Sequence, residues 1–299
     1  MNNYFCSLVT KSHISHIIST FYSIYRFNNN YVLFLVIIDD HDDDINKISN
    51  NFKTKLFNKN SIKIVKLSDI INSDNSYLKI YNKYVNYTSS GKDMMRNNNK
   101  VDILRYSIKV CLISYLLKYT NIDSVIWIDC DLYFISDIND IFDILKTKEV
   151  VLTPHFRNTK NEMNRHLIFR DGFFNVGFIG FNKTSICLDW YIQQIYFTCD
   201  LIDGYYYYEQ KYLDYFPVLT DNIEILRCGN YNISEWNIDT CIREIKENNN
   251  LYIIKDNNIS KPIFFHFTKY YIDMINNNLE TDIIKNYLDE YVMLQKLFS

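Results

Sequence analysis

The sequence predicts a single α/β domain with a mostly parallel central sheet flanked by helices, and three observations support this. Short apolar runs, typical of buried strands, alternate with segments of helical periodicity through the first half of the chain. A long helical segment then leads directly into a further apolar run at 125–128, which ends in two aspartates. The 299 residues, 47% of them hydrophobic and 16% aromatic, are enough to bury a large core.

The first half of the chain predicts three strands and two helices before the aspartates. Strands are expected at 5–10, at 31–38 and, with weaker alternation, at 61–67. Helices are expected from 12 to about 27 and from about 101 to 119, because apolar residues recur there at helical spacing. The buried side of the longer helix is predicted to carry Leu104, Ile108, Cys111, Leu112, Tyr115 and Leu116.

The second half predicts fewer regular elements. Strands are expected at 150–154, 174–181 and 263–267, with a helix at 184–199 and a last one at about 281–298. The last helix should pack against the core, since a membrane-surface role favours a basic polar face. Residues 201–236 are aromatic and irregular, as segments that face a substrate often are.

The run VIWIDCDLYF, residues 125–134, contains the most informative motif. If it is one strand, Asp129 and Asp131 point to one side and Cys130 to the other. Two carboxylates so close repel unless a cation lies between them, and oxygen ligands favour a hard ion such as Mg²⁺ or Mn²⁺. Asp-x-Asp also arises by chance, because Asp caps turns and helices. The apolar residues on both sides favour a functional pair.

Composition excludes several classes of function. The net charge of −3, without a basic stripe, predicts no nucleic-acid partner. Seven cysteines without a C-x-x-C pair predict neither a disulfide framework nor a zinc site, and indicate a reducing compartment. The N-terminal residues lack the features of a signal peptide, and the longest apolar stretch, 31–38, is far shorter than a membrane span of about 20 residues. We therefore expect a soluble, cytoplasmic protein with no integral membrane segment.

Several segments in order extend the motif into a family pattern. After VIWIDCDLYFISD come TPH at 153–155, DGFFNVGFIGF at 171–181, EQKYLDYFP at 209–217, GNYNISEWN at 229–237 and FFHF at 264–267. This series, which covers most of residues 100–270, resembles metal-dependent nucleotide-sugar glycosyltransferases of the GT-A fold, related to the glycogenin and lipopolysaccharide galactosyltransferase group. The resemblance implies one Rossmann-like domain over 1–299. About 1–150 would bind the nucleotide, about 151–270 the sugar and acceptor, and about 271–299 would form a C-terminal packing helix.

The resemblance assigns a metal site and a donor. It implies that Asp129, Asp131 and His266 hold Mn²⁺ or Mg²⁺ against the diphosphate of a UDP- or GDP-sugar. The chemistry agrees, because a metal stabilises the charge that grows on a leaving nucleoside diphosphate. Taken alone, a histidine in an apolar strand is more often a core residue.

Further donor-binding residues follow from the resemblance to the first half of the family fold. The ends of the first two strands would hold the nucleoside, which points to Thr10 and to Asp39 or Asp40; a surface turn explains the aspartates equally well. Lys109, four residues after Arg105 on the long helix, would face the diphosphate. Relatives usually have Lys-Pro here, whereas this chain has Val110, and a solvated helix face explains either cation.

The sugar-binding residues implied by the resemblance are Asp171, Asn175, Gly177 and Trp236. The Asn175 amide can donate to and accept from sugar hydroxyls, and Gly177 permits close approach by a ligand. A strand bulge with a buried Asn is the structural alternative. Trp236 and the tyrosines at 205–208 could stack on sugar rings, although core packing is the commoner explanation of such runs.

Glu209 and Gln210 are the catalytic candidates, because relatives carry Asp-Gln beside the reacting sugar carbon. The group is retaining, which implies a retaining hexosyltransferase; an inverting enzyme would need a base, a role open to Glu209. Because Glu replaces Asp, a non-catalytic module that binds sugar nucleotides or glycans stays open as an alternative. Dehalogenase-type phosphatases, dinucleotide-binding proteins and P-loop enzymes are excluded, since their Gly-Asp, G-x-G-x-x-G and Gly-Lys-Ser/Thr sequences are missing.

Overall fold

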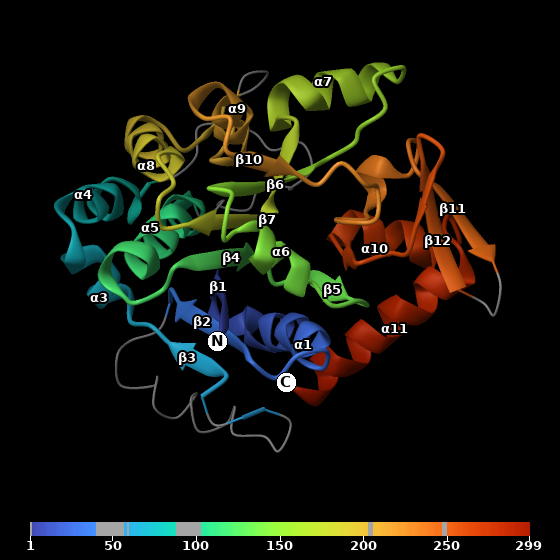
Figure 1. Ribbon diagram of the computed structural model, residues 1–299, viewed down its shortest axis with the longest axis horizontal. Coiled ribbons are helices and arrows are strands. Elements are labelled where there is room, and N and C mark those ends of the chain that lie inside the picture. Colours follow the sequence, from blue (N-terminus) through green and yellow to red (C-terminus); the bar gives the residue numbers. More distant parts are fainter. Residues whose placement is uncertain (1, 40–56, 59, 88–102, 203–205, 247–249) are drawn as a thin grey trace.

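A seven-stranded central sheet organises the protein (Figure 1). The computed structural model describes residues 2–39, 57–58, 60–87, 103–202, 206–246 and 250–299. The strand order is β10-β6-β7-β4-β1-β2-β3. The bounds are β1 Asn3–Val9, β2 Tyr31–Ile37, β3 Ile62–Ile64, β4 Ser124–Ile128, β6 Val150–Pro154, β7 Phe174–Asn182 and β10 Ile223–Ile225. Four of the six neighbouring pairs are parallel, which confirms the predicted mixed α/β class with a mostly parallel sheet.

The strand directions place several predicted site residues at one edge. Strands β1, β2 and β4 run in parallel, so their carboxyl ends meet at the same edge of the sheet. Strand β7 runs antiparallel to β4, with Phe178 opposite Ile128. The first residues of β7, including Asn175 and Gly177, therefore lie where β4 ends.

Helices cover both faces of the sheet, and the alternation of side chains along each strand divides the core between them. On one face, Cys6 and Leu8 of β1 pack in the cluster that includes α5, residues Ile103–Tyr119. On the other face, Phe5 and Val9 pack in the cluster of α1. The described residues contain these further helices: α1 Ile14–Tyr25, α3 Leu67–Ser73, α4 Asn75–Tyr84, α6 Asn139–Ile144, α7 Glu162–Asp171, α8 Cys187–Phe197 and α9 Phe216–Leu219.

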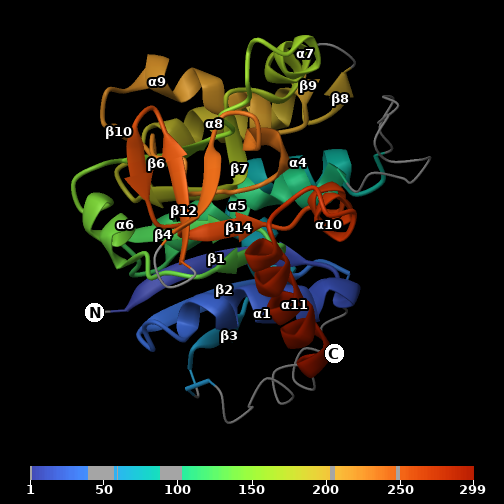
Figure 2. The same cartoon turned by 90° about the vertical axis from the view of Figure 1, so that its right-hand side faces the viewer.

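A second set of elements lies outside the central sheet, and it includes β5, which directly follows the two aspartates. Strand β5, Leu132–Phe134, pairs antiparallel with β14, Phe264–His266. Helix α11, Asp282–Leu297, packs against α1, as the turned view shows (Figure 2). The remaining elements of this part are β11 Ile242–Lys246, β12 Asn250–Lys255, β13 Asn258–Ser260 and α10 Lys269–Asn276.

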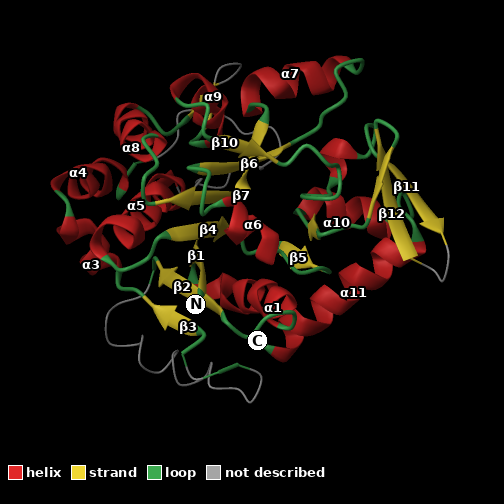
Figure 3. Cartoon of the chain, in the orientation of Figure 1, coloured by secondary structure: helices red, strands yellow, loops and turns green. Residues whose placement is uncertain are grey.

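The expected elements compare well with the observed ones in most places (Figure 3). The strand at 150–154 has the predicted bounds, and the last helix buries Ile284, Leu288, Tyr291 and Leu294 as its spacing predicts. The strand expected at 61–67 ends early because α3 begins at Leu67. Within the described residues, every helix is too short or too polar to cross a membrane.

Two expectations were wrong. The run 125–134 is not one strand: β4 ends at Ile128, the chain turns, and β5 joins a different sheet. The segment 201–236 is less irregular than expected. It holds β8 Leu201–Ile202, β9 Tyr206–Tyr207, η2 Gln210–Tyr215, α9, β10 and η3 Glu235–Asn237. A further short element, η1 Lys11–His13, precedes α1 near the start of the chain. These pieces are too short for periodicity to reveal.

Candidate metal centre

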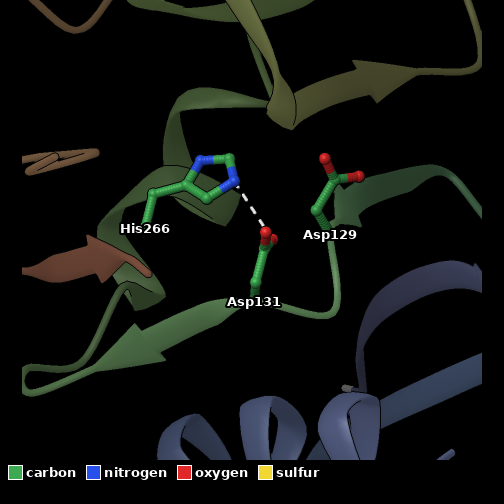
Figure 4. A group of neighbouring side chains, drawn as sticks. All are labelled: Asp129, Asp131 and His266. Carbon is green, nitrogen blue, oxygen red and sulfur yellow. Dashed lines mark ion pairs between the residues drawn. The ribbon is translucent and has the colours of Figure 1, made fainter. Parts of the chain in front are cut away.

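Asp129, Asp131 and His266 converge on one point (Figure 4). The two aspartates lie in the turn between β4 and β5, and His266 is the last residue of β14. Pairing of β14 with β5 places His266 opposite Leu132, beside Asp131. The backbone N–H of Asp129 donates to the carbonyl of Gly177 at 2.8 Å, which ties the turn to β7. The turn between two sheets, rather than alternation along one strand, brings the carboxylates together.

The donor set fits a divalent cation. One ligand atom from each of Asp129, Asp131 and His266 lies within 4.8 Å of the others, and His266 Nε2 is 3.0 Å from Asp131 Oδ1. The aspartate side chains are 31% and 35% exposed, so an ion and its remaining ligands can enter from solvent. Two carboxylates and one imidazole suit Mn²⁺, Mg²⁺ or a similar ion.

The charges at the centre favour a proton or a metal between Asp131 and His266. Burial alone would raise the pKa of Asp131, but the neighbouring His266 holds it below its ordinary value. Burial alone would lower the pKa of His266, but Asp131 raises it above its ordinary value. A bound cation would replace that proton, because a metal ligand must be deprotonated.

Asn232 orients the histidine. His266 Nδ1 donates to Asn232 Oδ1 at 3.0 Å, so Nε2 is the nitrogen that faces Asp131 and that would bind a cation after losing its proton. Asn232 is fully buried and has a left-handed backbone with φ 55°. Its carbonyl accepts from Asn237 Nδ2 at 2.9 Å, so the loop that carries it is itself fixed.

Gly177 lies against the same centre. A Cβ at this position would be 2.7 Å from His266 Cε1, 2.8 Å from Asn175 Oδ1 and 3.1 Å from Asp129 Oδ2. Such distances are too short for real contacts, so the position excludes any side chain. The groups that approach Gly177 closely are therefore side chains of the protein itself.

A buried ion pair borders the centre on the helix side. Lys109 Nζ lies 2.9 Å from Glu209 Oε1 and 3.5 Å from Asp129 Oδ1. Burial alone would lower the pKa of Lys109, but Asp129 and Glu209 together raise it. The ammonium also lies 4.8 Å from the centre of the Trp127 ring, whose N–H donates to Asp129 Oδ1 at 2.6 Å. Lys109 therefore stays charged and links Glu209 to the metal centre.

A hydrogen-bonded network adjoins Gly177 on its other side. Asn175 Nδ2 donates to Gln210 Oε1 at 3.2 Å and to His155 Nε2 at 3.3 Å, and Asn175 Oδ1 accepts from the Gly177 N–H at 2.9 Å. Gln210 Nε2 donates to the carbonyl of Asp171 at 3.0 Å. Burial, followed by Arg157, lowers the pKa of His155 well below its ordinary value, so its ring is neutral.

Trp236 packs between His155 and His266 of the metal centre. Its ring meets those of His155 and His266 edge to face, at 5.4 and 5.1 Å between ring centres. Within the part of the chain that the structure describes, its buried N–H finds no hydrogen-bond partner. Asp171, another residue expected to bind the sugar, has its carboxylate paired with Arg157 and Arg170.

The nucleoside candidates lie at neighbouring strand ends. Thr10 follows β1 and bonds Ser12 and His13 through its hydroxyl, at 2.9 and 2.8 Å. Asp39 follows β2, is exposed, and accepts from the Lys11 N–H at 2.8 Å. Asp40, the alternative to Asp39, is outside the described residues, as is Tyr205.

Sequence reasoning missed several residues of this region. Asn232, Trp127 and His155 all occur in the quoted segments, but their roles depend on contacts that spacing does not reveal. His13 and His16, whose ring centres lie 5.3 Å apart, were also missed. Their spacing of three residues, at the start of a helix that follows a strand, was the sequence pattern that could have indicated them.

Comparison with known proteins gives one sequence relative. No protein-family model matches the chain. An uncharacterised protein, YfnF of Bacillus subtilis (strain 168), is 23% identical over 286 residues, which cover 92% of this chain and 84% of that protein. Because that protein is uncharacterised, this match does not indicate a function for the chain.

Solved structures show the fold. Mouse xyloside xylosyltransferase 1 matches with a TM-score of 0.52 at 12% identity, over 90% of this chain and 98% of that one. The galactosyltransferase LgtC, solved with donor and acceptor sugar analogs, matches with a TM-score of 0.53 at 10% identity, over 89% and 87%. The chain spans only 45% of the glycosyltransferase GlyE of Streptococcus pneumoniae TIGR4, at a TM-score of 0.41 and 15% identity. The protein has the fold of the GT-A glycosyltransferases, with an Asp-x-Asp and histidine triad at the carboxyl edge of its sheet.

Proposed function

We propose that this protein is a metal-dependent glycosyltransferase. It would move a sugar from a nucleotide-diphosphate sugar to a hydroxyl of a glycan or another acceptor. The observation that carries the proposal is the convergence of Asp129, Asp131 and His266 at the carboxyl edge of a GT-A sheet. In open α/β sheets this edge is where ligands bind.

The three residues would hold Mn²⁺ or Mg²⁺, which when bound neutralises the charge that develops on the leaving diphosphate. Thr10 and Asp39, at the ends of β1 and β2, would hold the nucleoside of a UDP- or GDP-sugar. The division into a nucleotide half, about 1–150, and an acceptor half, about 151–270, remains a prediction.

The ion pair of Lys109 and Glu209 favours transfer with retention. A general base must contact the acceptor hydroxyl, whereas the buried Oε1 of Glu209 lies 2.9 Å from the Lys109 ammonium. In a retaining transfer, a bond forms between the acceptor oxygen and the anomeric carbon as the bond from that carbon to the diphosphate breaks. The proton of the acceptor hydroxyl then passes to the departing diphosphate. Glu209 and Gln210 would position and stabilise the sugar, and Lys109 would hold Glu209 in place.

The same ion pair also supports the second candidate, a module that binds sugar nucleotides or glycans without turnover. Glu209 replaces the Asp of the family pattern, and its buried Oε1 pairs with Lys109. The two candidates agree on metal-dependent binding and differ only in turnover.

A thermal-shift screen of UDP- and GDP-sugars with Mn²⁺, Mg²⁺ or a chelator tests binding, and release of the nucleoside diphosphate tests turnover. A ligand at 100 times its Kd stabilises a protein by about 2.7 kcal/mol, a measurable shift. Asp131→Asn should remove the metal-dependent shift. Asp123→Asn is the matched control, because Asp123 is exposed and precedes the opposite end of β4.

A shift with sugar nucleotides and metal, together with release of diphosphate product, is the expected result. A shift without release supports the binding module. A metal-dependent shift that persists in Asp131→Asn contradicts the assigned centre.

A further inference from the structure

A cavity of about 530 Å³ lies beside the metal centre, in the region of α7, β6, β10 and β12 of Figure 1. It is lined by the end of β6, the loop after β10, the turn between β12 and β13, and the segment around α7. Its volume falls within the range of about 300–1,000 Å³ that small-molecule sites occupy. All of its lining residues come from 154–260, the half predicted to bind the acceptor.

The cavity is cationic. Three cations line it, Arg157, Arg227 and Lys255, against one anion, Asp256; Arg157 is already paired with the buried Asp171 at 3.0 Å. Lys255 Nζ pairs with Asp256 Oδ2 at 2.6 Å, but the Asp256 side chain is 79% exposed, so a ligand acid competes with a largely solvated carboxylate. Arg227 has no ion-pair partner among the described residues. His155 also lines the cavity but is neutral, because burial and Arg157 lower its pKa.

The cavity also offers aromatic surface. Phe156 and Phe173 line it, and Phe173 is 58% exposed, which is high for a large apolar side chain. Phe156 has a left-handed backbone with φ 56°, a conformation that bulky residues adopt only where the surrounding structure imposes it. Lys255 Nζ lies 4.3 Å from the centre of the Phe156 ring. One cation and one aromatic face are thus held together at the cavity.

The hairpin turn that follows Lys255 helps to hold it there. Asp256 and Asn257 both have positive φ, at 49° and 65°, and connect β12 to β13 as a two-residue loop. Turns of this kind match the twist of the strands that they join. The ammonium is therefore presented by fixed backbone rather than by a free loop.

His155 connects the cavity with the metal centre. Its ring lines the cavity, accepts from Asn175 Nδ2, and packs against Trp236, which in turn packs against His266. Two side chains therefore separate the cavity from the centre. A ligand would need more than one sugar unit to extend past both side chains and occupy the cavity and the centre together.

We propose that the cavity binds an acidic sugar unit of the acceptor, whose carboxylate or phosphate pairs with Arg227 and Lys255 while its ring lies on the phenylalanines. This rests on the proposed function, because it names the acceptor of the same site. The acidic unit lies next to the reacting sugar of the acceptor rather than on it. Aromatic faces suit the apolar face of a sugar ring, and guanidinium groups pair with carboxylates and phosphates in two-point contacts.

The experiment measures the affinity of simple probes by calorimetric titration. The probes are methyl β-glucuronide for a carboxylate, glucose 6-phosphate for a phosphate, and methyl β-glucoside as the neutral match. At least one acidic probe should bind about tenfold more tightly than the neutral one, the size of one charged hydrogen bond. The two acidic probes distinguish a uronic acid from a sugar phosphate. Equal affinity for all three probes overturns the proposal.

Substitutions of the cations that line the cavity test whether the acidic group binds there. Arg227→Gln and Lys255→Gln should each weaken binding of the acidic probe about tenfold and leave the neutral probe unchanged. Arg227→Lys keeps the charge but loses the two-point contact, so its affinity should fall between those of the native protein and Arg227→Gln, which a purely structural role would not predict. Lys146→Gln, at an exposed cation that follows α6, is the control. If acid binding persists in both glutamine variants while their melting temperatures are unchanged, the proposal is wrong.

Donor hydrolysis without acceptor separates this inference from the proposed function. Metal-dependent hydrolysis with no preference for acidic probes would overturn only the inference. A preference for acidic probes without metal-dependent use of any sugar nucleotide would overturn the transferase role. The cavity would then be an acid-binding site, but its ligand would not be the acceptor of a transfer reaction.

Discussion

His266 and Asn232 form a hydrogen bond of 3.0 Å between Nδ1 and Oδ1, on the side of the imidazole away from Asp131. The bond keeps a proton on Nδ1, so Nε2 is the nitrogen that faces the two carboxylates and would bind a cation after losing its own proton. Residue 232 must also adopt a left-handed backbone, which Asn, Asp and Gly tolerate. Asparagine at this position meets both requirements.

Asn232→Gly should therefore weaken metal binding while keeping the backbone. Loss of a hydrogen bond to a ligand histidine typically reduces metal affinity about 10–100-fold. Asn232→Asp keeps an acceptor and should bind Mn²⁺ at least as well as the native protein. Titration of free Mn²⁺ by electron paramagnetic resonance measures both. Asn278→Gly, at another left-handed asparagine in the turn after α10, is the control and should bind normally.

Gly177→Ala should disrupt the centre because the new Cβ would lie 2.7 Å from His266 Cε1. Overpacking of this kind destabilises proteins by about 1–3 kcal/mol, and displacement of His266 should also reduce Mn²⁺ affinity at least about tenfold. Gly180→Ala on the same strand meets Leu145 Cδ1 at 2.9 Å, the end of a flexible side chain that can move. Urea unfolding and metal titration of both variants test this, and equal metal affinities would contradict it.

Lys109→Met should destabilise the fold strongly. It leaves the Glu209 carboxylate buried without its cation, and breaking a buried pair in this way typically costs about 3–5 kcal/mol. Glu209→Gln should be milder, because Asp129 remains 3.5 Å from the ammonium. The double variant Lys109→Met with Glu209→Gln should be more stable than Lys109→Met alone. A double-mutant cycle by urea unfolding measures the coupling, and additive effects would show that the pair is not coupled.

The product should retain the anomeric configuration of the donor, as NMR of the product would show. Removal of a general base usually lowers rates 10²–10⁴-fold, so Glu209→Gln should reduce transfer by less than about 100-fold if no proton passes to Glu209. An inverted product, together with near-complete loss of activity in Glu209→Gln, would identify Glu209 as the base instead.

Stability should fall as pH drops below about 6.5, in part because of His155. Its folded pKa is lowered by burial and by Arg157, so the unfolded chain binds more protons between the folded pKa and the ordinary value of about 6.5. The contribution is fully present above that value and is lost as pH falls toward the folded pKa. His155→Gln should flatten the pH dependence of the free energy of unfolding between pH 7 and 5. An unchanged slope would contradict this assignment.

The sequence alone determined the fold class and part of the site. Apolar runs record burial along one element, so they located β1, β2, β4, β6 and β7. The order of the family segments singled out Asp129, Asp131 and His266, and the structure brings these three together. Short helices such as α3 and α6 escaped prediction, because one or two turns contain too few residues to show a period.

Only the tertiary structure decided how the site is built. Alternation along a strand was the wrong reason for the two carboxylates to meet; a turn between two sheets joins them. The pairing of Lys109 with Glu209, and of His266 with Asn232, links residues 100 and 34 positions apart. Such contacts depend on how helices and strands pack across the core, and local periodicity carries no information about distance between elements. The sequence thus specified which residues can take part in the chemistry, and packing determined which of them touch.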